Sequence, residues 1–397
     1  MAEHPILSWN ADGRAQTARW YAAGGTPPPR RVVPADDRMC ADIAYRLVCE
    51  GTAVLWQGDY HGGRQLLAAL GRRIDRRSAR RGRRPAAPAG GRATGPADAF
   101  HRHRQAQGHR ARVLGMLLVP LEPGPRGPAV PLRRAPDVAE AATAAYGPVT
   151  EPGAVALREL LGAVGAHEWR RKGVDIPALG ARVHPHYGVF SPVRGEYVDL
   201  VAEAPLPAKS LAFDVGTGTG VLAAVLARRG VERVVATDTD PRALACARDN
   251  VDRLGLADQV EVVEGNLFPP GRAPLVVCNP PWLPAKPTSA LEHAVYDPGG
   301  GMLHGFLAGL AVHLEPGGEG WLVLSDLAEH LGLRGRGELL GAIEAAGLRV
   351  AARHDTRPRH RKATDPSDPL HAARAAEVTS LWRLTAAADG GGMSGAG

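Results

Sequence analysis

The stretch LAFDVGTGTG, residues 211–220, joins a short apolar run to a turn that holds three glycines spaced two residues apart. The apolar run is typical of a buried β-strand, and the pattern of residues 221–229 is typical of a helix. In an open α/β sheet, ligands bind beyond the carboxyl ends of the strands, where glycine lets the backbone approach them closely. The stretch therefore predicts a strand–turn–helix unit that binds a ligand at its glycine turn.

Apolar runs and helical patterns alternate from about residue 209 onward. The expected strands are 209–214, 233–238, 259–263, 274–278, 319–325 and 378–384, and the expected helices are 218–229, 241–254, 301–314 and 337–346. An alternation of this kind predicts a parallel sheet with helices on both faces.

A carboxylate ends the second of these strands. Asp238 follows the glycine turn by about 20 residues, where a carboxylate can accept hydrogen bonds from both ribose hydroxyls of an adenosine group. Asp240 and Pro241 are typical of a helix N-cap and a first helical residue. The third strand leads to Asn266, which would lie beside the adenine edge. The chain has no glycine-rich loop ending in Gly-Lys-Ser/Thr, which excludes an NTP-binding P-loop.

On these residues, the segment 209–384 resembles a class I S-adenosylmethionine-dependent methyltransferase. The resemblance implies an α/β fold with a seven-stranded, Rossmann-like sheet of order 3-2-1-4-5-7-6 and an antiparallel last strand. It also implies that the glycine turn holds the methionine part of the cofactor, that Asp238 binds the ribose, and that Asn266 approaches the adenine amine, although the family usually carries aspartate there. The glycine turn by itself leaves open a nicotinamide-dependent enzyme with a variant loop. The expected cofactor-binding residues are Asp214, Gly216, Thr217, Gly218, Gly220, Asp238, Asn266 and Asn279.

Asn279-Pro280-Pro281-Trp282 directly follows the fourth strand. Two prolines at a strand end cannot donate ladder hydrogen bonds, and they fix an extended, rigid turn. The Asn279 side-chain oxygen and the Pro280 carbonyl would then accept hydrogen bonds from one NH₂ group, whose lone pair faces the cofactor methyl. Trp282 offers a flat face on which a planar group can stack. These four are the expected catalytic residues, and a Pro-Pro turn capped by a core tryptophan is the purely structural alternative.

At this place in the fold, Asn-Pro-Pro-aromatic resembles N-methyltransferases that act on protein glutamine side chains or on exocyclic amines of nucleobases. Residues 190–200 are similar to the proline-arginine-acid segment of release-factor glutamine methyltransferases, and residues 297–301 to the glycine-rich loop after their motif. Small-methyltransferase-domain proteins are similar as well. Trp282 stands at the position where the release-factor enzymes have a tyrosine. The resemblance implies methyl transfer to an amide or amine nitrogen, with a protein glutamine-type side chain as the leading acceptor.

The rest of the chain divides by composition. Residues 1–75 carry apolar stripes at helical spacing and predict a mainly helical N-terminal region that covers part of the site and selects substrate. Residues 76–112, rich in Arg, Gly and Pro, predict a linker or loop. Residues 113–181 predict a mixed accessory region, 182–386 the methyltransferase domain, and the glycine-rich 387–397 a disordered tail.

The positive charge of the chain is concentrated in one segment. The 397 residues hold 48 Lys and Arg against 41 Asp and Glu, a net charge of +7. Residues 72–112 contribute 13 arginines and two aspartates, which leaves the other 356 residues with a net charge of −4. Such a segment can bind phosphates, or it can be a solvated linker. An RNA or DNA substrate therefore stays open beside a protein substrate.

Several classes are disfavoured by what the sequence lacks. It has no apolar run of about 18 residues and no basic start followed by an apolar stretch, so no membrane partner or secretory signal is expected. The scattered cysteines predict reduced thiols in a cytoplasmic protein, and the histidines have no metal-ligand spacing, so no metal is expected. A non-catalytic, cofactor-binding regulatory protein is the remaining alternative to an enzyme.

Overall fold

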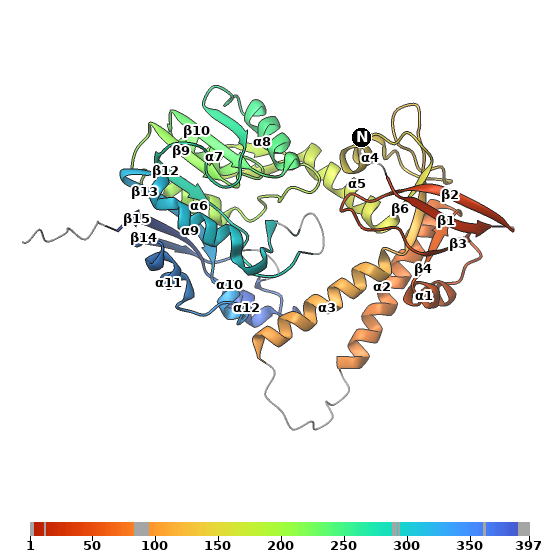
Figure 1. Cartoon of the computed structure of the whole chain (residues 1–397). Helices are drawn as coiled ribbons and strands as arrows, with labels where there is room; N and C mark the ends of the chain where they lie inside the picture. Colours follow the sequence, from red (N-terminus) through yellow and green to blue (C-terminus); the bar gives the residue numbers. More distant parts are fainter. Residues whose placement is uncertain are drawn as a thin grey trace, which may run out of the picture. The chain divides into compact units, whose positions relative to one another are not determined.

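The computed structural model describes residues 4–11, 13–82, 95–287, 292, 294–359 and 363–387. The chain divides into two compact units, of which the first comprises Met1–Thr94 and His101–Trp169 and the second Gly95–Phe100 and Arg170–Gly397. Each unit is built on a sheet of its own (Figure 1). Within the described ranges, no helix combines the length and the apolar character needed to span a membrane.

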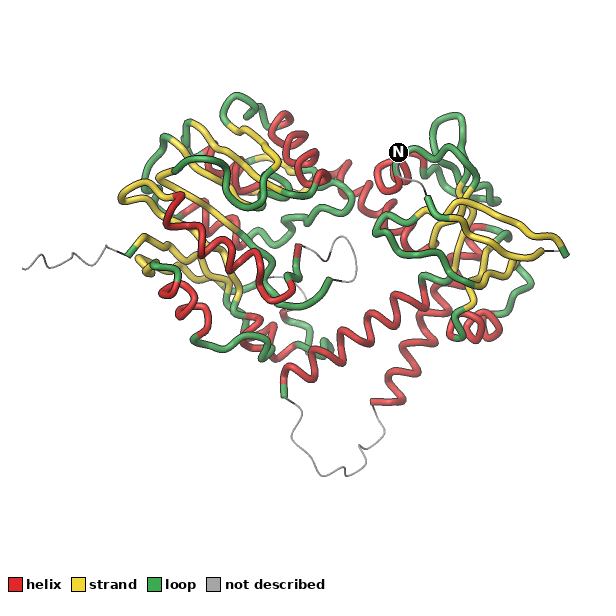
Figure 2. The backbone as a smooth tube through the Cα atoms, viewed as in Figure 1, coloured by secondary structure: helices red, strands yellow, loops and turns green. Residues whose placement is uncertain are grey.

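A mixed six-stranded sheet of order β1-β2-β6-β5-β4-β3 forms the centre of the first unit. Its strands are β1 (Ile6–Ala11), β2 (Arg14–Tyr21), β3 (Arg31–Ala35), β4 (Thr52–Trp56), β5 (Leu117–Leu121) and β6 (Gly153–Ala156). The helices along this part of the chain are α1 (Ala41–Cys49), α2 (Tyr60–Gly82), α3 (Pro96–Leu114), α4 (Ala139–Tyr146) and α5 (Leu157–Lys172) (Figure 2).

The prediction of a mainly helical N-terminal region is wrong, because four of these strands lie within residues 1–75. β4 runs between the parallel neighbours β3 and β5 and is buried along its whole length. A strand of this kind is a continuous apolar run without alternation, which periodicity alone does not distinguish from a buried helix. β1 and β2 form an antiparallel pair whose turn contains Gly13 at a φ of +74°.

The predicted linker over residues 76–112 is also wrong for its described part. α2 continues to Gly82 and α3 begins at Pro96, which occupies the first helical position that proline favours. Arginine is a good helix former, so an Arg-rich composition does not oppose a helix. Residues 83–94, which hold two prolines and two glycines, and the predicted tail from residue 388 onward lie outside the described residues.

The second unit contains a seven-stranded sheet of order β11-β10-β9-β12-β13-β15-β14. The strands are β9 (Leu211–Val215), β10 (Arg233–Asp238), β11 (Val260–Glu264), β12 (Ala273–Cys278), β13 (Leu314–Ser325), β14 (Leu348–Thr356) and β15 (Thr379–Ala386). Numbered along the sheet's own chain order this is 3-2-1-4-5-7-6, and β15 is antiparallel to both neighbours. The predicted fold class and strand order are confirmed. A small hairpin of β7 (Val174–Ile176) and β8 (Ala181–Val183) also belongs to this unit.

Helices cover both faces of this sheet (Figure 1). The helices of this unit are α6 (Glu196–Glu203), α7 (Val221–Arg228), α8 (Pro241–Arg253), α9 (Gly301–His313), α10 (Leu327–His330), α11 (Glu338–Ala345) and α12 (His371–Ala376). Successive strand residues point to opposite faces, so Val277 packs with α6 and α7 while its neighbour Val276 packs with α9 and α11. Five parallel strands, β9 to β13, therefore bring their carboxyl ends to one edge of the sheet.

Candidate functional site

The glycine turn is tied to the carboxyl end of the neighbouring strand β10. The backbone N–H groups of Gly216 and Thr217 both donate to the Thr237 carbonyl, each at 2.9 Å. The N–H of Gly218 donates to Asp238 Oδ2 at 3.0 Å. The glycine turn after β9 and the carboxylate at the end of β10 are thus joined by hydrogen bonds.

The three glycines of the turn are required for different reasons. All have positive φ, which is +72° at Gly216, +57° at Gly218 and +79° at Gly220, and side chains disfavour this region. A Cβ at Gly216 would lie 2.3 Å from Cε of Met302, and one at Gly220 would lie 3.3 Å from Cα of Ala247. A Cβ at Gly218 would meet none of the described atoms within 4 Å. Gly218 therefore differs from the other two glycines, because its conformation and not a close neighbour requires glycine.

Asp214 stabilises the glycine turn through buried hydrogen bonds. Its carboxylate is buried, and Oδ2 accepts hydrogen bonds from the Thr217 hydroxyl at 2.6 Å and from the Ala223 N–H at 3.1 Å. Burial raises the pKa of Asp214 to about 6, although both hydrogen bonds oppose the increase. Asp214 and the buried Thr217, both predicted to bind cofactor, hold the shape of the loop.

We expect Asp214→Asn to alter the pH dependence of stability while keeping the fold, because the asparagine carbonyl oxygen can accept both hydrogen bonds. The pKa of Asp214 is about 6 in the fold against an ordinary 3.8, so the folded wild type binds this proton more tightly than the unfolded chain. Its free energy of unfolding should therefore fall by about 3 kcal/mol as the pH rises through this range. Denaturant melts of both proteins between about pH 4 and 7 measure their free energies of unfolding. As the pH rises, the stability of the wild type should fall relative to that of the variant. A pH-independent difference would contradict the prediction.

Asp238 is half-buried at the end of β10, and both of its oxygens are fixed. Oδ2 accepts from Gly218, and Oδ1 accepts from the N–H of Asp240 at 2.9 Å. The loop after β11 is held against the same strand end, because the Gly265 N–H donates to the Asp238 carbonyl at 3.1 Å and the Thr237 hydroxyl donates to the Leu267 carbonyl. Asn266 lies between these two attachments with an exposed side chain.

The Asn-Pro-Pro-Trp motif lies beside the glycine turn. β12 pairs with β9 so that Cys278 is opposite Val215, which places Asn279 next to Gly216 at the strand ends. The Asn279 Oδ1 accepts a hydrogen bond from the indole N–H of Trp282 at 2.9 Å. Trp282 is partly buried and packs against the hydrophobic clusters of both sheet faces. Its ring therefore fixes the orientation of the Asn279 side chain.

The structure brings together the predicted residues at this edge of the sheet. They are Asp214, Gly216, Thr217, Gly218, Gly220, Asp238, Asn266, Asn279, Pro280, Pro281 and Trp282.

The loop before α9 supplies a contact that the sequence pattern did not reveal. Its Asp297 accepts a hydrogen bond from the Met302 N–H at 2.6 Å, and the Met302 side chain reaches Gly216. Gly299 and Gly300 have φ values of +71° and +69°, which allow the sharp turn into the helix. The start of α9, which this loop leads into, thus packs on the glycine turn.

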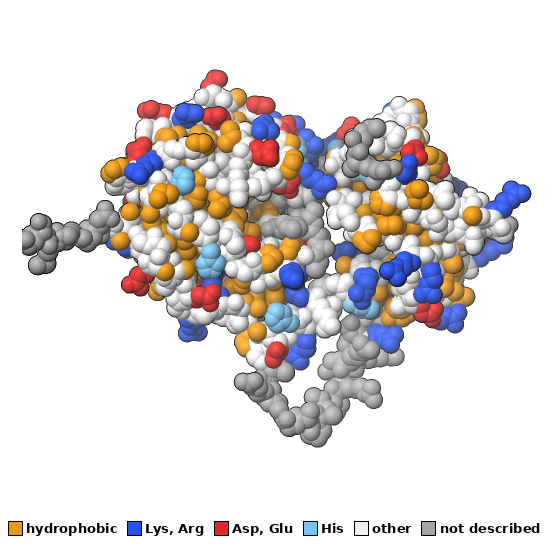
Figure 3. Space-filling view, in the orientation of Figure 1, with side chains coloured by type: hydrophobic (Ala, Val, Ile, Leu, Met, Phe, Trp, Pro, Cys, Tyr) orange, Lys and Arg blue, Asp and Glu red, His pale blue; other side chains and the backbone are white. Residues whose placement is uncertain are grey.

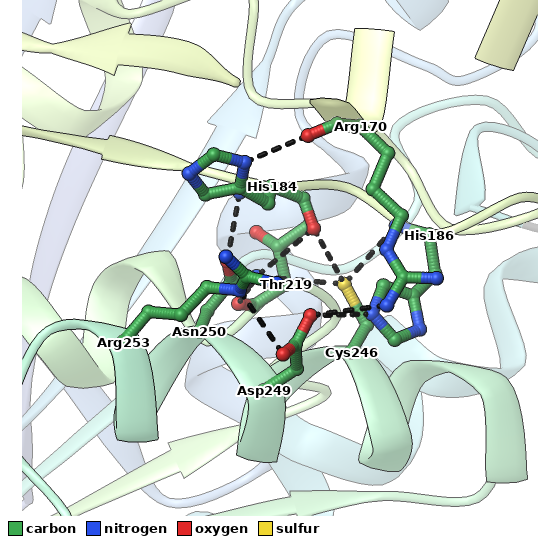
Figure 4. Close-up of polar contacts among 8 residues, drawn as sticks. All are labelled: Arg170, His184, His186, Thr219, Cys246, Asp249, Asn250 and Arg253. Carbon is green, nitrogen blue, oxygen red and sulfur yellow. Dashed lines mark hydrogen bonds and ion pairs between the residues drawn. The ribbon is translucent and has the colours of Figure 1, made fainter. Parts of the chain in front are cut away.

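The segment that precedes α6 is fastened to α8 by a polar cluster (Figure 4). The N–H of His184 donates to Asn250 Oδ1 at 2.7 Å, and Nε2 of His186 lies 3.0 Å from Asp249 Oδ2. Burial lowers the pKa of His186, and burial raises the pKa of the Cys246 thiol to about 11. These histidines therefore have a structural role: they hold the start of the segment that leads to α6 against α8.

Residues 181–334 match the family model described as methyltransferase small domain. The match includes the glycine turn, Asp238 and the Asn-Pro-Pro-Trp motif, and it lies inside the second unit. Together with the strand order, it shows that this unit carries an S-adenosylmethionine-dependent methyltransferase domain.

Two kinds of curated relative are similar to this domain. A ribosomal protein L11 methyltransferase from Pelotomaculum thermopropionicum is 39% identical over 145 residues, which cover 36% of this chain and 39% of that protein. A release factor glutamine methyltransferase from Cereibacter sphaeroides is 34% identical over 169 residues, which cover 39% of this chain and 58% of that protein. The chain thus spans less than two thirds of the length of either relative. A solved ribosomal protein L11 methylase from Lactobacillus delbrueckii subsp. bulgaricus aligns over 50% of this chain and 81% of its own, with 15% identity and a TM-score of 0.34.

Proposed function

We propose that this protein transfers a methyl group from S-adenosylmethionine to a side-chain amide nitrogen of a protein, of the glutamine type. The observation that carries the proposal is the place of Asn279-Pro280-Pro281-Trp282, directly after β12 and in register with the glycine turn. The names of one group of relatives, the release factor glutamine methyltransferases, support the same acceptor.

The site has the features that the cofactor requires. The space at Gly218 is open among the described atoms, and the Asp238 carboxylate is held at the border of that space. Gly218 would accommodate the methionine part, Asp238 would accept the ribose hydroxyls, and Asn266 would approach the adenine amine. When bound, S-adenosylmethionine would supply a methyl group on a positively charged sulfur: the nitrogen lone pair forms a bond to the methyl carbon as the S–CH₃ bond breaks, and the sulfur leaves as the neutral thioether of S-adenosylhomocysteine.

The Asn279 side chain and the Pro280 carbonyl would orient the acceptor nitrogen. An amide nitrogen is a poor nucleophile because its lone pair is delocalised. Hydrogen bonds from both of its N–H groups to fixed oxygens favour a pyramidal nitrogen with the lone pair directed at the methyl group. Among the described residues, the Asn279 Oδ1 accepts a hydrogen bond from the Trp282 N–H alone, which leaves one of its two lone pairs for the substrate. Water can take the released proton.

The test is incubation of a cell extract with the purified protein and methyl-labelled cofactor, followed by digestion with protease or nuclease. We expect the label to be released by protease. Acid hydrolysis of the labelled fraction should then yield volatile methylamine, because an N-methyl carboxamide hydrolyses to a carboxylic acid and methylamine, whereas a methylated aliphatic amine stays attached. Label that survives protease and is released by nuclease would overturn the proposed acceptor.

The second candidate acceptor is an exocyclic amine of RNA or DNA. It is favoured by the arginines of α2, of which Arg72, Arg76 and Arg77 are exposed. Figure 3 shows Lys and Arg side chains over α1 and α2 on the face of the first unit in view. Arg73, by contrast, pairs with Asp42 and has a structural partner. A cofactor-binding regulatory protein, the third alternative, would give no labelled product from any fraction.

A further inference from the structure

A partly buried ion pair borders the tryptophan of the site. Arg194 Nη1 lies 3.3 Å from Glu377 Oε1, and the guanidinium carbon lies 5.8 Å from the centroid of the Trp282 ring. Glu377 has no exposed surface, whereas the Arg194 side chain keeps 20% of its surface exposed. The pair thus places a cation beside the ring whose N–H orients Asn279, on a side chain that keeps part of its surface exposed.

Glu377 is fixed from the same sheet edge that carries the rest of the site. The hydroxyl of Ser325, the last residue of β13, donates to Glu377 Oε1 at 2.8 Å, and the Leu327 N–H donates to that hydroxyl at 3.0 Å. The second carboxyl oxygen of Glu377 is buried without a hydrogen-bond partner among the described residues. Burial raises the pKa of Glu377, and the Arg194 charge opposes this increase. Ionised Glu377 therefore depends on Arg194, and Arg194 is held in place in return.

An acceptor carboxamide is chemically complementary to this arrangement. It offers N–H donors to the oxygens of Asn279 and Pro280, and it also offers one carbonyl oxygen that requires a donor. The Arg194 guanidinium has five N–H donors, and within the described part of the chain its one hydrogen bond, to Glu377, leaves others available. A lysine ammonium, by contrast, has no acceptor atom and carries a charge that Arg194 repels.

We infer that Arg194 is a specificity-determining residue that donates to the carbonyl oxygen of the acceptor carboxamide, and that Glu377 acts through it as a positioning residue. The inference rests on the proposed function, because it concerns the acceptor of that reaction. According to this inference, the Arg194–Glu377 ion pair selects a neutral carboxamide over a cationic amine.

The test uses the full-length protein and two synthetic peptides that differ only in a central Gln or Lys. For Arg194→Met, which removes the charge and the donors, we expect kcat/KM toward the Gln peptide to fall by about 10- to 100-fold, mainly through KM. The ratio of kcat/KM values for Gln over Lys should fall with it, while the affinity for the cofactor stays the same. Arg194→Lys should restore part of the ratio, and Glu377→Gln should have an intermediate effect.

Calorimetric binding of both peptides to protein saturated with S-adenosylhomocysteine separates this inference from the proposed function. If the wild type binds the Gln peptide more tightly than the Lys peptide and Arg194→Met loses this preference, the inference is supported. If no methyl transfer is detected in that case, only the proposed function is overturned. If Arg194→Met loses affinity equally toward both peptides, the ratio of Gln to Lys affinities is unchanged and the inference is overturned. Methyl transfer to the Gln peptide by the wild type would still support the proposed function in that case. Wild type that binds neither peptide overturns both.

Discussion

Asn279→Ala should lower kcat for methyl transfer by about 100-fold or more while leaving cofactor affinity nearly unchanged. The substitution removes the oxygen that the Trp282 N–H holds in place, and with it one of two acceptors for the substrate N–H groups. Without that acceptor the nitrogen lone pair is no longer directed at the methyl group. Single-turnover transfer with labelled cofactor measures the rate, and calorimetry measures cofactor binding.

Trp282→Phe is the matched variant for this prediction. Phenylalanine keeps a flat apolar ring but has no N–H to donate to Asn279, so the side chain of Asn279 regains rotational freedom. We expect a loss of about 10-fold, between wild type and Asn279→Ala. Transfer at the wild-type rate in Asn279→Ala would show that the motif has a structural role only.

Asp238→Ala should weaken cofactor binding by about 100-fold, the effect of losing two hydrogen bonds to a charged group. The carboxylate would accept from the ribose, and it also fixes the turn through the Gly218 N–H at 3.0 Å. The dissociation constant for S-adenosylmethionine, measured by calorimetry, is the direct readout.

Asp240→Ala serves as the control for Asp238→Ala. Asp240 is exposed and caps α8, because its side chain accepts from the Arg242 N–H at 2.9 Å. Loss of this cap should cost about 1 kcal/mol of stability without changing the cofactor dissociation constant. If the two alanine variants bind the cofactor equally well, Asp238 has no role in holding the ribose.

The second unit could be predicted from the sequence because its signals are local. Each strand is a short apolar run, and the functional residues lie at a strand end or directly after it, as Asp238 ends β10 and Asn279 follows β12. Parallel strands bring their carboxyl ends to one edge, so the topology alone places these residues together. The first unit could not be predicted in this way, since the buried strand β4 has no alternating pattern.

The sequence by itself thus determined the methyltransferase sheet, the glycine turn, and the identity of the residues at its edge, because each is encoded in a short stretch of chain. The tertiary structure alone decided the contacts around them. Arg194 and Glu377 are 183 positions apart in the chain, and Met302 reaches Gly216 from the first turn of α9. The first pair forms only when the sheet places the start of α6, the end of β13 and the start of β15 side by side. The second forms only when α9 lies against the turn after β9. No local pattern of residues records either placement.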